Sequence, residues 1–399
     1  MSNTSFPKIP LPIVIFLMLL WPTYSVLFDF LRWQNPDEAS FIGGARLLIG
    51  LEGAWDEQSR MTKPLVLIVP GLAEWALNIH PKWTFIAQNG VCYFLNILVL
   101  WRFFWLLSKD VYQSSMALLM YHLCQPLAIF STFVLTDMPG WLMANWIALE
   151  ALILLETNAF FQQKEVATRF FGLGILTGLG LLCKESALIG GIFTAVLLLL
   201  KPNWAFPYKL KMGSLTLVGF VLILMLGSWF SMQMTNDTIF KRVNNMWDYE
   251  PGRGYYNLSN WPQVYRLLDQ FWVLVLLGSY QIAKHWATYK SNFIYIALLI
   301  TIPLGLLLLP AVYPFIVDRL IFLVAPYLLF IGSLALKAYP PRLSFAIILL
   351  GGLLNIGCAY CIYAYQTEGL IALTLLLFMA TLGLAHYLNN RYKKPDILV

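Results

Sequence analysis

The sequence predicts an all-α membrane protein, a polytopic bundle of about twelve transmembrane helices with juxtamembrane helices in its first external loop. Of its 399 residues, 59% are hydrophobic and only 12% are charged, against about 25% charged residues in ordinary soluble domains. The mean hydropathy is +0.70, which is typical of chains that lie in lipid. Helices are the expected form of the apolar runs, because backbone in hydrocarbon must satisfy its own hydrogen bonds.

Apolar runs close to the length needed to cross a bilayer place the expected spans. The first run is too long for the hydrophobic part of a signal peptide and further spans follow it, so we expect a membrane helix there rather than a cleaved leader. The fifth and sixth runs are short, and Lys184-Glu185 separates them. The expected spans are 11–31, 84–107, 112–131, 139–156, 170–183, 186–201, 213–232, 267–283, 291–310, 319–336, 343–365 and 370–388.

The segment 64–80 is apolar but contains Pro70, Gly71 and Glu74, so it could either cross the membrane or lie along its surface. The bias of Lys and Arg toward cytoplasmic loops separates the two arrangements. With a cytoplasmic N-terminus and 64–80 on the surface, fifteen of the 26 basic residues but only five of the 20 acidic residues fall on the cytoplasmic side. We therefore predict that 64–80 lies on the outer face and that both termini are cytoplasmic.

The predicted organisation is a single membrane domain over 1–399 without internal repeats. Its parts are a first external loop with candidate catalytic acids and interfacial helices (32–83), central helices (84–232), a second external loop (233–266) and C-terminal helices (267–399). The net charge of +6 comes without a long basic cluster, so no nucleic-acid partner is expected. The odd number of cysteines argues against a disulfide framework.

The first external loop contains the adjacent acids Asp37 and Glu38 directly after Pro36. A carboxylate at the membrane surface can take a proton from an acceptor hydroxyl or ligate a divalent cation. The alternative is that Asn35 caps a short helix and the two acids only occupy its favourable first turn. The residue types alone leave both interpretations open.

Further charged residues lie at the predicted outer ends of the helices. Lys63 precedes the apolar segment 64–80 and could pair with a lipid phosphate or simply anchor that segment at the surface. Asp137, before Pro139, could act at the surface or cap the next helix. Lys184-Glu185 is either functional or a local ion pair in a short hairpin. Arg319 could grip a phosphate or pair with Asp318.

The second external loop mixes aromatic, acidic and basic residues, among them Arg253 and Tyr255. Such a mixture suits a sugar-binding surface, although aromatic residues are also common at membrane interfaces. No Ser/His/Asp arrangement and no phosphate-binding Walker motif occur in the sequence. ATP-driven transport by this chain is therefore not expected.

The order of these features resembles the GT-C superfamily of membrane glycosyltransferases, and within it the protein O-mannosyltransferases and lipid A aminoarabinose transferases. An Asp-Glu pair in the first external loop is followed by a Lys-Pro-Pro-Leu-like element, here Lys63-Pro64-Leu65 without the second proline. A Thr-Asp-Met-Pro element is matched in full at 136–139, and a glycine-rich helix then ends at Lys184-Glu185. The resemblance covers about residues 10–340, and the second external loop is shorter than the pattern.

The resemblance implies transfer of a sugar from a polyprenyl-phosphate donor to a lipid, glycan or protein acceptor, on the face away from the cytoplasm and usually with inversion. It implies Asp37 as the general base, with Glu38 and Asp137 orienting the acceptor. Lys63 and Arg319, with Arg46 or Lys184, would neutralise the phosphate. Glu185, Arg253 and Tyr255 are further substrate-binding candidates. No cofactor is certain, but Asp37 and Asp137 could hold Mg²⁺ or Mn²⁺ if a divalent cation is used.

Two other function classes compete with this interpretation. A transporter or flippase for lipid-linked sugars is expected to have ionisable residues at the membrane midplane or two related halves. The spans are almost free of charge, apart from His122 and the Lys184-Glu185 pair, and no repeat is visible. A polysaccharide polymerase or ligase, or a structural subunit of an envelope complex, is the third class. Ligases typically carry several arginines and a histidine in a large external loop, and 233–266 contains no histidine.

Overall fold

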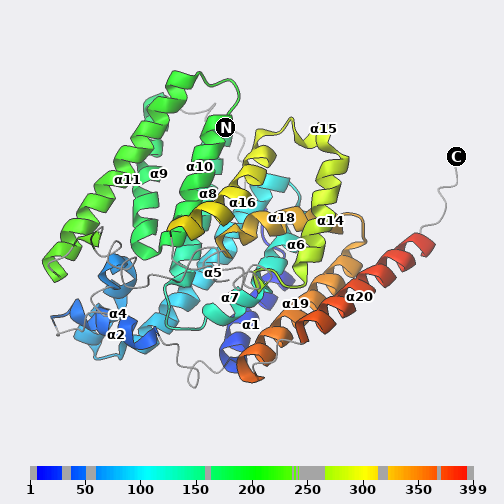
Figure 1. Cartoon of the computed structure of the whole chain (residues 1–399), viewed down its shortest axis with the longest axis horizontal. Helices are drawn as coiled ribbons and strands as arrows, with labels where there is room; N and C mark the ends of the chain where they lie inside the picture. Colours follow the sequence, from blue (N-terminus) through cyan, green and yellow to red (C-terminus); the bar gives the residue numbers. More distant parts are fainter. Residues whose placement is uncertain are drawn as a thin grey trace.

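The computed structural model describes residues 7–28, 37–50, 60–157, 163–235, 238–239, 241, 266–312, 322–365 and 370–392. Within these ranges the regular secondary structure is helical throughout, with no β-strand. Figure 1 shows the helices gathered into one bundle, with α2 and α4 toward one end and the α10–α11 turn and α15 toward the opposite end. The predicted all-α fold is confirmed. The longer helices are α1 (Leu11–Leu27), α2 (Glu38–Leu47), α4 (Pro64–Leu77), α5 (Pro81–Ser108), α6 (Val111–His122), α8 (Asp137–Thr157), α9 (Gln163–Cys183), α10 (Leu188–Leu200), α11 (Phe206–Thr235), α14 (Phe271–Lys284), α16 (Phe293–Val312), α18 (Ala325–Leu336), α19 (Pro341–Tyr365) and α20 (Leu370–Tyr392).

Short helices connect these elements: the 3-10 turns η1 (Arg60–Thr62), η3 (Glu185–Ala187) and η5 (Phe322–Val324), and the helices α7 (Gln125–Phe130) and α15 (Trp286–Tyr289). Several helices begin with a proline in their first turn, where its missing N–H and fixed φ are favourable; these are α1, α4, α5, α7 and α18. Helix α6 begins with a side-chain cap instead. The Asp110 carboxylate accepts hydrogen bonds from the backbone N–H groups of Tyr112 and Gln113, at 2.8 and 3.4 Å.

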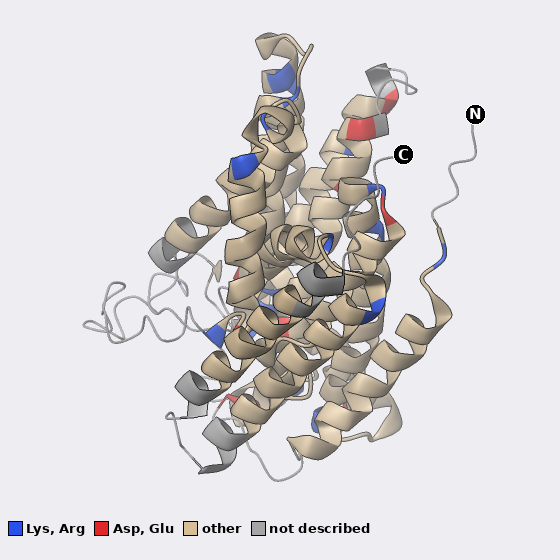
Figure 2. Ribbon diagram, turned by 90° about the vertical axis from the view of Figure 1, so that its right-hand side faces the viewer, with Lys and Arg blue, Asp and Glu red and all other residues tan. Residues whose placement is uncertain are grey.

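Five helices in the described part of the chain are long and apolar enough to cross a membrane, by length and composition: 81–108, 137–156, 165–183, 206–235 and 341–360. Seven shorter apolar helices accompany them. Figure 2 shows charged residues as short, separated segments on a largely uncharged bundle. This is the pattern expected of a polytopic protein, whose helix surfaces face lipid rather than water.

The predicted span 112–131 is different in the structure, where it forms two helices, α6 and α7. Pro126 lies in the first turn of α7 and cannot donate a backbone hydrogen bond to a continuing α6. The chain then leaves helical geometry over 131–136 before α8 begins at Asp137. This interruption determines where Asp137 lies.

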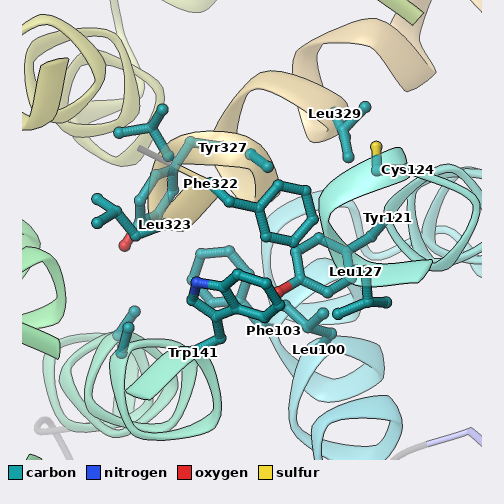
Figure 3. Packing of buried hydrophobic residues seen from close by; sticks show 14 of the residues in the cluster. Leu100, Phe103, Tyr121, Cys124, Leu127, Trp141, Phe322, Leu323, Tyr327 and Leu329 are labelled. Atoms are coloured by element: carbon teal, nitrogen blue, oxygen red, sulfur yellow. The ribbon is translucent and has the colours of Figure 1, made fainter. Parts of the chain in front are cut away.

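The core around the first turn of α8 is aromatic. Trp141, one turn after Asp137, packs on Phe322 with 4.8 Å between ring centroids, and Tyr121 contacts the same ring at 4.9 Å. Figure 3 shows these three side chains pointing toward one another from three different elements. Trp141 and Tyr121 are only 1% exposed and Phe322 is fully buried. Dense aromatic packing therefore fixes the first turn of α8 against α6 and η5.

Candidate functional site

The segment 131–136, which leads into Asp137, is held by side chains from two other helices. The Asn89 amide of α5 donates to the backbone oxygen of Phe133 at 2.6 Å. The indole N–H of Trp21 in α1 donates to the backbone oxygen of Ser131 at 3.2 Å. Buried irregular backbone needs such partners because its polar groups are shielded from water. The contacts therefore position Asp137 rigidly at the start of α8.

Asp137 pairs with Lys184, the residue that follows α9. The Lys184 Nζ lies 3.0 Å from the Asp137 Oδ1, and the two side chains are 4% and 0% exposed. Gly140 allows this approach, because a Cβ atom on it would lie 2.5 Å from the Lys184 Cβ and 2.8 Å from the Ser186 Oγ. A buried charge pair of this kind stays together because either charge alone would be strongly destabilising.

Lys63, directly before α4, pairs with Glu185. Its Nζ lies 3.2 Å from the Glu185 Oε1, and the lysine side chain is only 4% exposed. A lysine that merely anchored α4 at the membrane surface would extend its amine into water, whereas this amine is buried. Lys184 and Glu185 therefore take separate partners on α8 and before α4, rather than forming the local pair that a short hairpin would have.

Burial and charge act in opposite directions on Glu185. Burial alone would raise the pKa of its carboxyl group, but the positive charges of Lys63 and Lys184 outweigh it and hold that pKa below the ordinary 4.5. One carboxylate oxygen of Glu185, together with the hydroxyls of Ser186 and Thr136, has no hydrogen-bond partner within the described ranges. Glu185 and Ser186 directly follow Lys184 in the sequence, and Thr136 directly precedes Asp137, the partner of Lys184.

Asp37 and Glu38 begin α2, and each faces a different cation. The Arg60 guanidinium donates to the Asp37 Oδ1 at 2.9 Å and to the Ser40 Oγ at 2.8 Å, and it lies over the Phe41 ring at 4.4 Å. The Lys82 Nζ lies 2.7 Å from the Glu38 Oε1. The Asp37 side chain is 31% exposed and makes no capping hydrogen bond to α2. Its carboxylate is therefore positioned by Arg60, not used as a helix cap.

The two groups are joined through η1. Arg60 is the first residue of η1, and the backbone N–H of Lys63, just after η1, donates to the Arg60 oxygen at 2.9 Å. Three ion pairs, Asp37–Arg60, Lys63–Glu185 and Lys184–Asp137, are thus linked along the chain through η1 and through the adjacent residues Lys184 and Glu185. We call this set of six residues the charged row.

The other predicted site residues are placed less centrally or fall outside the described ranges. Arg46 of α2 makes three hydrogen bonds to the Glu74 carboxylate of α4, between 2.8 and 3.1 Å. It thereby ties the two juxtamembrane helices together. Arg319, Arg253 and Tyr255 lie outside the residues that the structure describes.

The described carboxylates do not converge on a common cation site. Asp37 and Asp137, the predicted ligands if a divalent ion is used, are paired with Arg60 and Lys184. Within the described ranges no three His, Cys, Asp or Glu side chains are close enough together to hold a metal ion.

Several residues of the site did not stand out in the sequence. Arg60 and Lys82, the cations that face Asp37 and Glu38, were not among the candidates, although both lie in the first external loop near Lys63. Apart from this site, Asp269, before α14, is a further buried acid with 2% exposure. Its place at the edge of an expected span was the available sequence signal for it.

Two solved membrane enzymes share this arrangement of helices. ArnT from Cupriavidus metallidurans bound to undecaprenyl phosphate superposes with a TM-score of 0.57 at 14% identity, covering 94% of this chain and 75% of that one. The same protein in its apo state gives 0.54 at 13% identity, over 94% and 76%. The Archaeoglobus fulgidus oligosaccharyltransferase in complex with zinc and sulfate gives 0.55 at 14% identity, over 91% of this chain and 53% of that one. This chain thus spans about half the length of the oligosaccharyltransferase. No family model matches the sequence, and no curated protein matches it.

Proposed function

From the GT-C fold of this chain, which it shares with ArnT and the archaeal oligosaccharyltransferase, we propose that the protein is a membrane glycosyltransferase. It transfers a hexosyl or pentosyl group from a polyprenyl-phosphate-linked donor to a lipid, glycan or protein acceptor. The observation that carries the proposal is the charged row, which brings a half-exposed carboxylate and buried lysines together at one end of an apolar bundle. The undecaprenyl phosphate bound by ArnT supports a carrier of this chemical class.

In this proposal Asp37 is the general base. Its carboxylate takes the proton of the acceptor hydroxyl as that oxygen forms a bond to the anomeric carbon of the sugar. The bond from the anomeric carbon to the phosphate oxygen breaks, and its electron pair leaves with the phosphate, so the sugar carbon is inverted. Arg60 holds the carboxylate in place through Asp37 Oδ1 and Ser40.

Lys63 has the role of neutralising the departing phosphate, with Lys184, Arg46 and Arg319 as further cations. The negative charge on the phosphate grows as the bond breaks, so a fixed cation in a site with little water stabilises the transition state more than the ground state. Lys63 is suited to this role because its side chain is buried just before α4, so its amine is held inside the protein and does not extend into water. Glu38 and Asp137 are assigned to orienting the acceptor.

The transfer is assigned to the non-cytoplasmic face. The support is the charge distribution between the loops, together with the separation of α2 and α4 from the α10–α11 turn and α15 in Figure 1. Both termini are then cytoplasmic, and the chain acts as one membrane domain. A polyprenyl phosphate in the outer leaflet places its phosphate at the depth of the charged row.

The proposal is tested with purified protein in liposomes that contain one of a panel of polyprenyl-phosphate sugars and an extract of candidate acceptors. Release of polyprenyl phosphate with labelling of an acceptor supports transfer. Movement of the intact lipid-linked sugar between leaflets, without release of polyprenyl phosphate for any member of the panel, would instead identify a flippase.

A further inference from the structure

Five cations at the α2–α4 end of the described bundle each face a carboxylate. Besides the pairs of the charged row, Arg46 pairs with Glu74 and Lys82 with Glu38. A phosphate that arrives here therefore meets cations that are already neutralised. It can be bound tightly only if a carboxylate gives up its partner, because unscreened like charges repel strongly in a site of low dielectric constant.

The pairs differ in how firmly each carboxylate is held. Glu74 accepts three hydrogen bonds from the planar Arg46 guanidinium, a strong geometry. The Asp137 side chain is completely buried, and Gly140 leaves the space that lets Lys184 approach it closely. Glu185 is the more accessible of the two carboxylates that pair with buried lysines, because its side chain is 18% exposed whereas that of Asp137 is 0% exposed.

We propose that Glu185 is a displaceable counter-ion, which holds Lys63 in the empty enzyme and yields it to the phosphate of the donor. This inference rests on the proposed function, and it makes Glu185 a positioning residue that acts through Lys63. No covalent bond changes in the exchange. The Lys63 ammonium turns from the Glu185 carboxylate to a phosphate oxygen and returns when the phosphate leaves.

The neighbouring lysine makes the exchange feasible. Glu185 lies in the electrostatic field of Lys184 as well as Lys63, and both charges stabilise its ionised form. When Lys63 turns away, the Glu185 carboxylate therefore retains an attractive positive charge and is not left as an isolated buried anion, which would be strongly unfavourable.

The exchange also gives a direction to the catalytic cycle. The donor is a phosphodiester with one negative charge, whereas the released polyprenyl phosphate carries about −1.5 to −2 at neutral pH. The demand on Lys63 thus increases as the sugar departs. Glu185 then competes for Lys63 and weakens the hold on the product, so its removal is expected to favour binding at the expense of release.

The experiment is a binding cycle with undecaprenyl phosphate as the probe, applied to the wild-type protein, Glu185→Gln, Lys63→Gln and the double variant. The dissociation constant of Glu185→Gln is expected to be lower than wild type by about tenfold, with a lower kcat and a lower KM for the donor. Lys63→Gln is expected to bind about tenfold more weakly. In the Lys63→Gln background, the second change Glu185→Gln is expected to lower the dissociation constant by much less than tenfold, since no lysine remains to be released and only the repulsion from the carboxylate is removed.

Two further variants keep the test decisive. Glu185→Asp retains the charge and is expected to bind the probe with an affinity between wild type and Glu185→Gln, which also covers the case in which Glu185→Gln folds poorly. Glu156→Gln removes the acid of an exposed pair with Lys109 at the other end of the bundle, and it is expected to bind like wild type.

The outcomes separate this inference from the proposed function. If Lys63→Gln weakens binding but Glu185→Gln leaves it unchanged or also weakens it, Glu185 is not a displaceable counter-ion although the phosphate site stands. If the wild-type protein does not bind undecaprenyl phosphate, or Lys63→Gln binds it equally well, the phosphate site itself is wrong and the inference falls with it.

Discussion

Asp137 and Lys184 form an ion pair with 3.0 Å between Oδ1 and Nζ, and both side chains are buried. The pair joins the first turn of α8 to the residue that follows α9, so it links two residues more than forty positions apart in the sequence. It lies over the aromatic contact between Trp141 and Phe322, one helical turn further along α8. The bundle thus brings a carboxylate and an ammonium group into its interior and fixes them on a rigid base.

Replacing Lys184 by Met should strongly destabilise the protein, because it leaves the Asp137 carboxylate buried without its ammonium partner. We expect the free energy of unfolding to fall by about 3–5 kcal/mol. Lys109→Met, which breaks a pair whose lysine is 54% exposed, should cost about 1 kcal/mol or less. Denaturant unfolding in detergent micelles measures both. Equal losses for the two variants would show that the buried pair is not a structural link.

Gly140→Ala should disturb the same link through sterics alone. The added Cβ would lie 2.5 Å from the Lys184 Cβ, so the lysine or the start of α8 must shift, and we expect a loss of about 1–3 kcal/mol in unfolding free energy. Gly172→Ala in α9 is the matched control. Its Cβ would meet no atom within 4 Å, and alanine is the better helix former by about 1 kcal/mol. A stability for Gly140→Ala at or above wild type would contradict the packing described.

Arg60→Lys tests whether Arg60 positions Asp37. Lysine cannot reproduce the fixed planar contacts to Asp37 and Ser40 or the stacking on Phe41. We expect kcat for sugar transfer to fall on the order of 10- to 100-fold, with little change in the donor KM. Arg169→Lys, at an exposed pair with Glu165, should be as active as wild type. Full activity of Arg60→Lys would show that Arg60 does not position Asp37 for catalysis.

The stability of the protein should depend on pH through Glu185. Its pKa in the folded state lies below the ordinary 4.5, so between the two values the unfolded chain binds more protons than the folded one. The stabilisation from its pair with Lys63 is therefore complete above the unfolded pKa and is lost as the pH falls through the folded pKa. The difference in unfolding free energy between wild type and Glu185→Gln should be constant at neutral pH and shrink in acid. A difference that grows in acid would show that folding raises the pKa of Glu185 rather than lowering it.

The apolar helices were predictable from sequence because each apolar run is a local property. The expected spans 84–107 and 139–156 differ from α5 and α8 by only a few residues at either end. The run 112–131 was expected to be one helix because it is apolar throughout. Its division depends on Pro126 and on the hydrogen bonds that Asn89 and Trp21 make to the segment 131–136, and the second of these causes is tertiary.

The residue types of the site were visible in the sequence, but their partners were not. Asp37, Lys63, Asp137 and Lys184-Glu185 were all candidates, each with a plausible local role as a cap, an anchor or a hairpin pair. The structure instead pairs Lys63 with Glu185, across more than one hundred positions. Such pairing is decided by the contact between α4 and α9, which no local pattern contains. The same holds for Arg60 and Lys82, whose importance comes only from the acids that they face.

The most direct test of the proposed function is a single-turnover assay of Asp37→Asn with a labelled polyprenyl-phosphate sugar and its acceptor. The substitution keeps the shape of the side chain but removes the base, and the half-exposed position of Asp37 should leave the fold intact. We predict that the rate of transfer falls by about 100- to 10,000-fold, while binding of undecaprenyl phosphate and the unfolding transition stay close to those of wild type. A correctly folded Asp37→Asn protein that transfers sugar at the wild-type rate would contradict the assignment of Asp37 as the catalytic base.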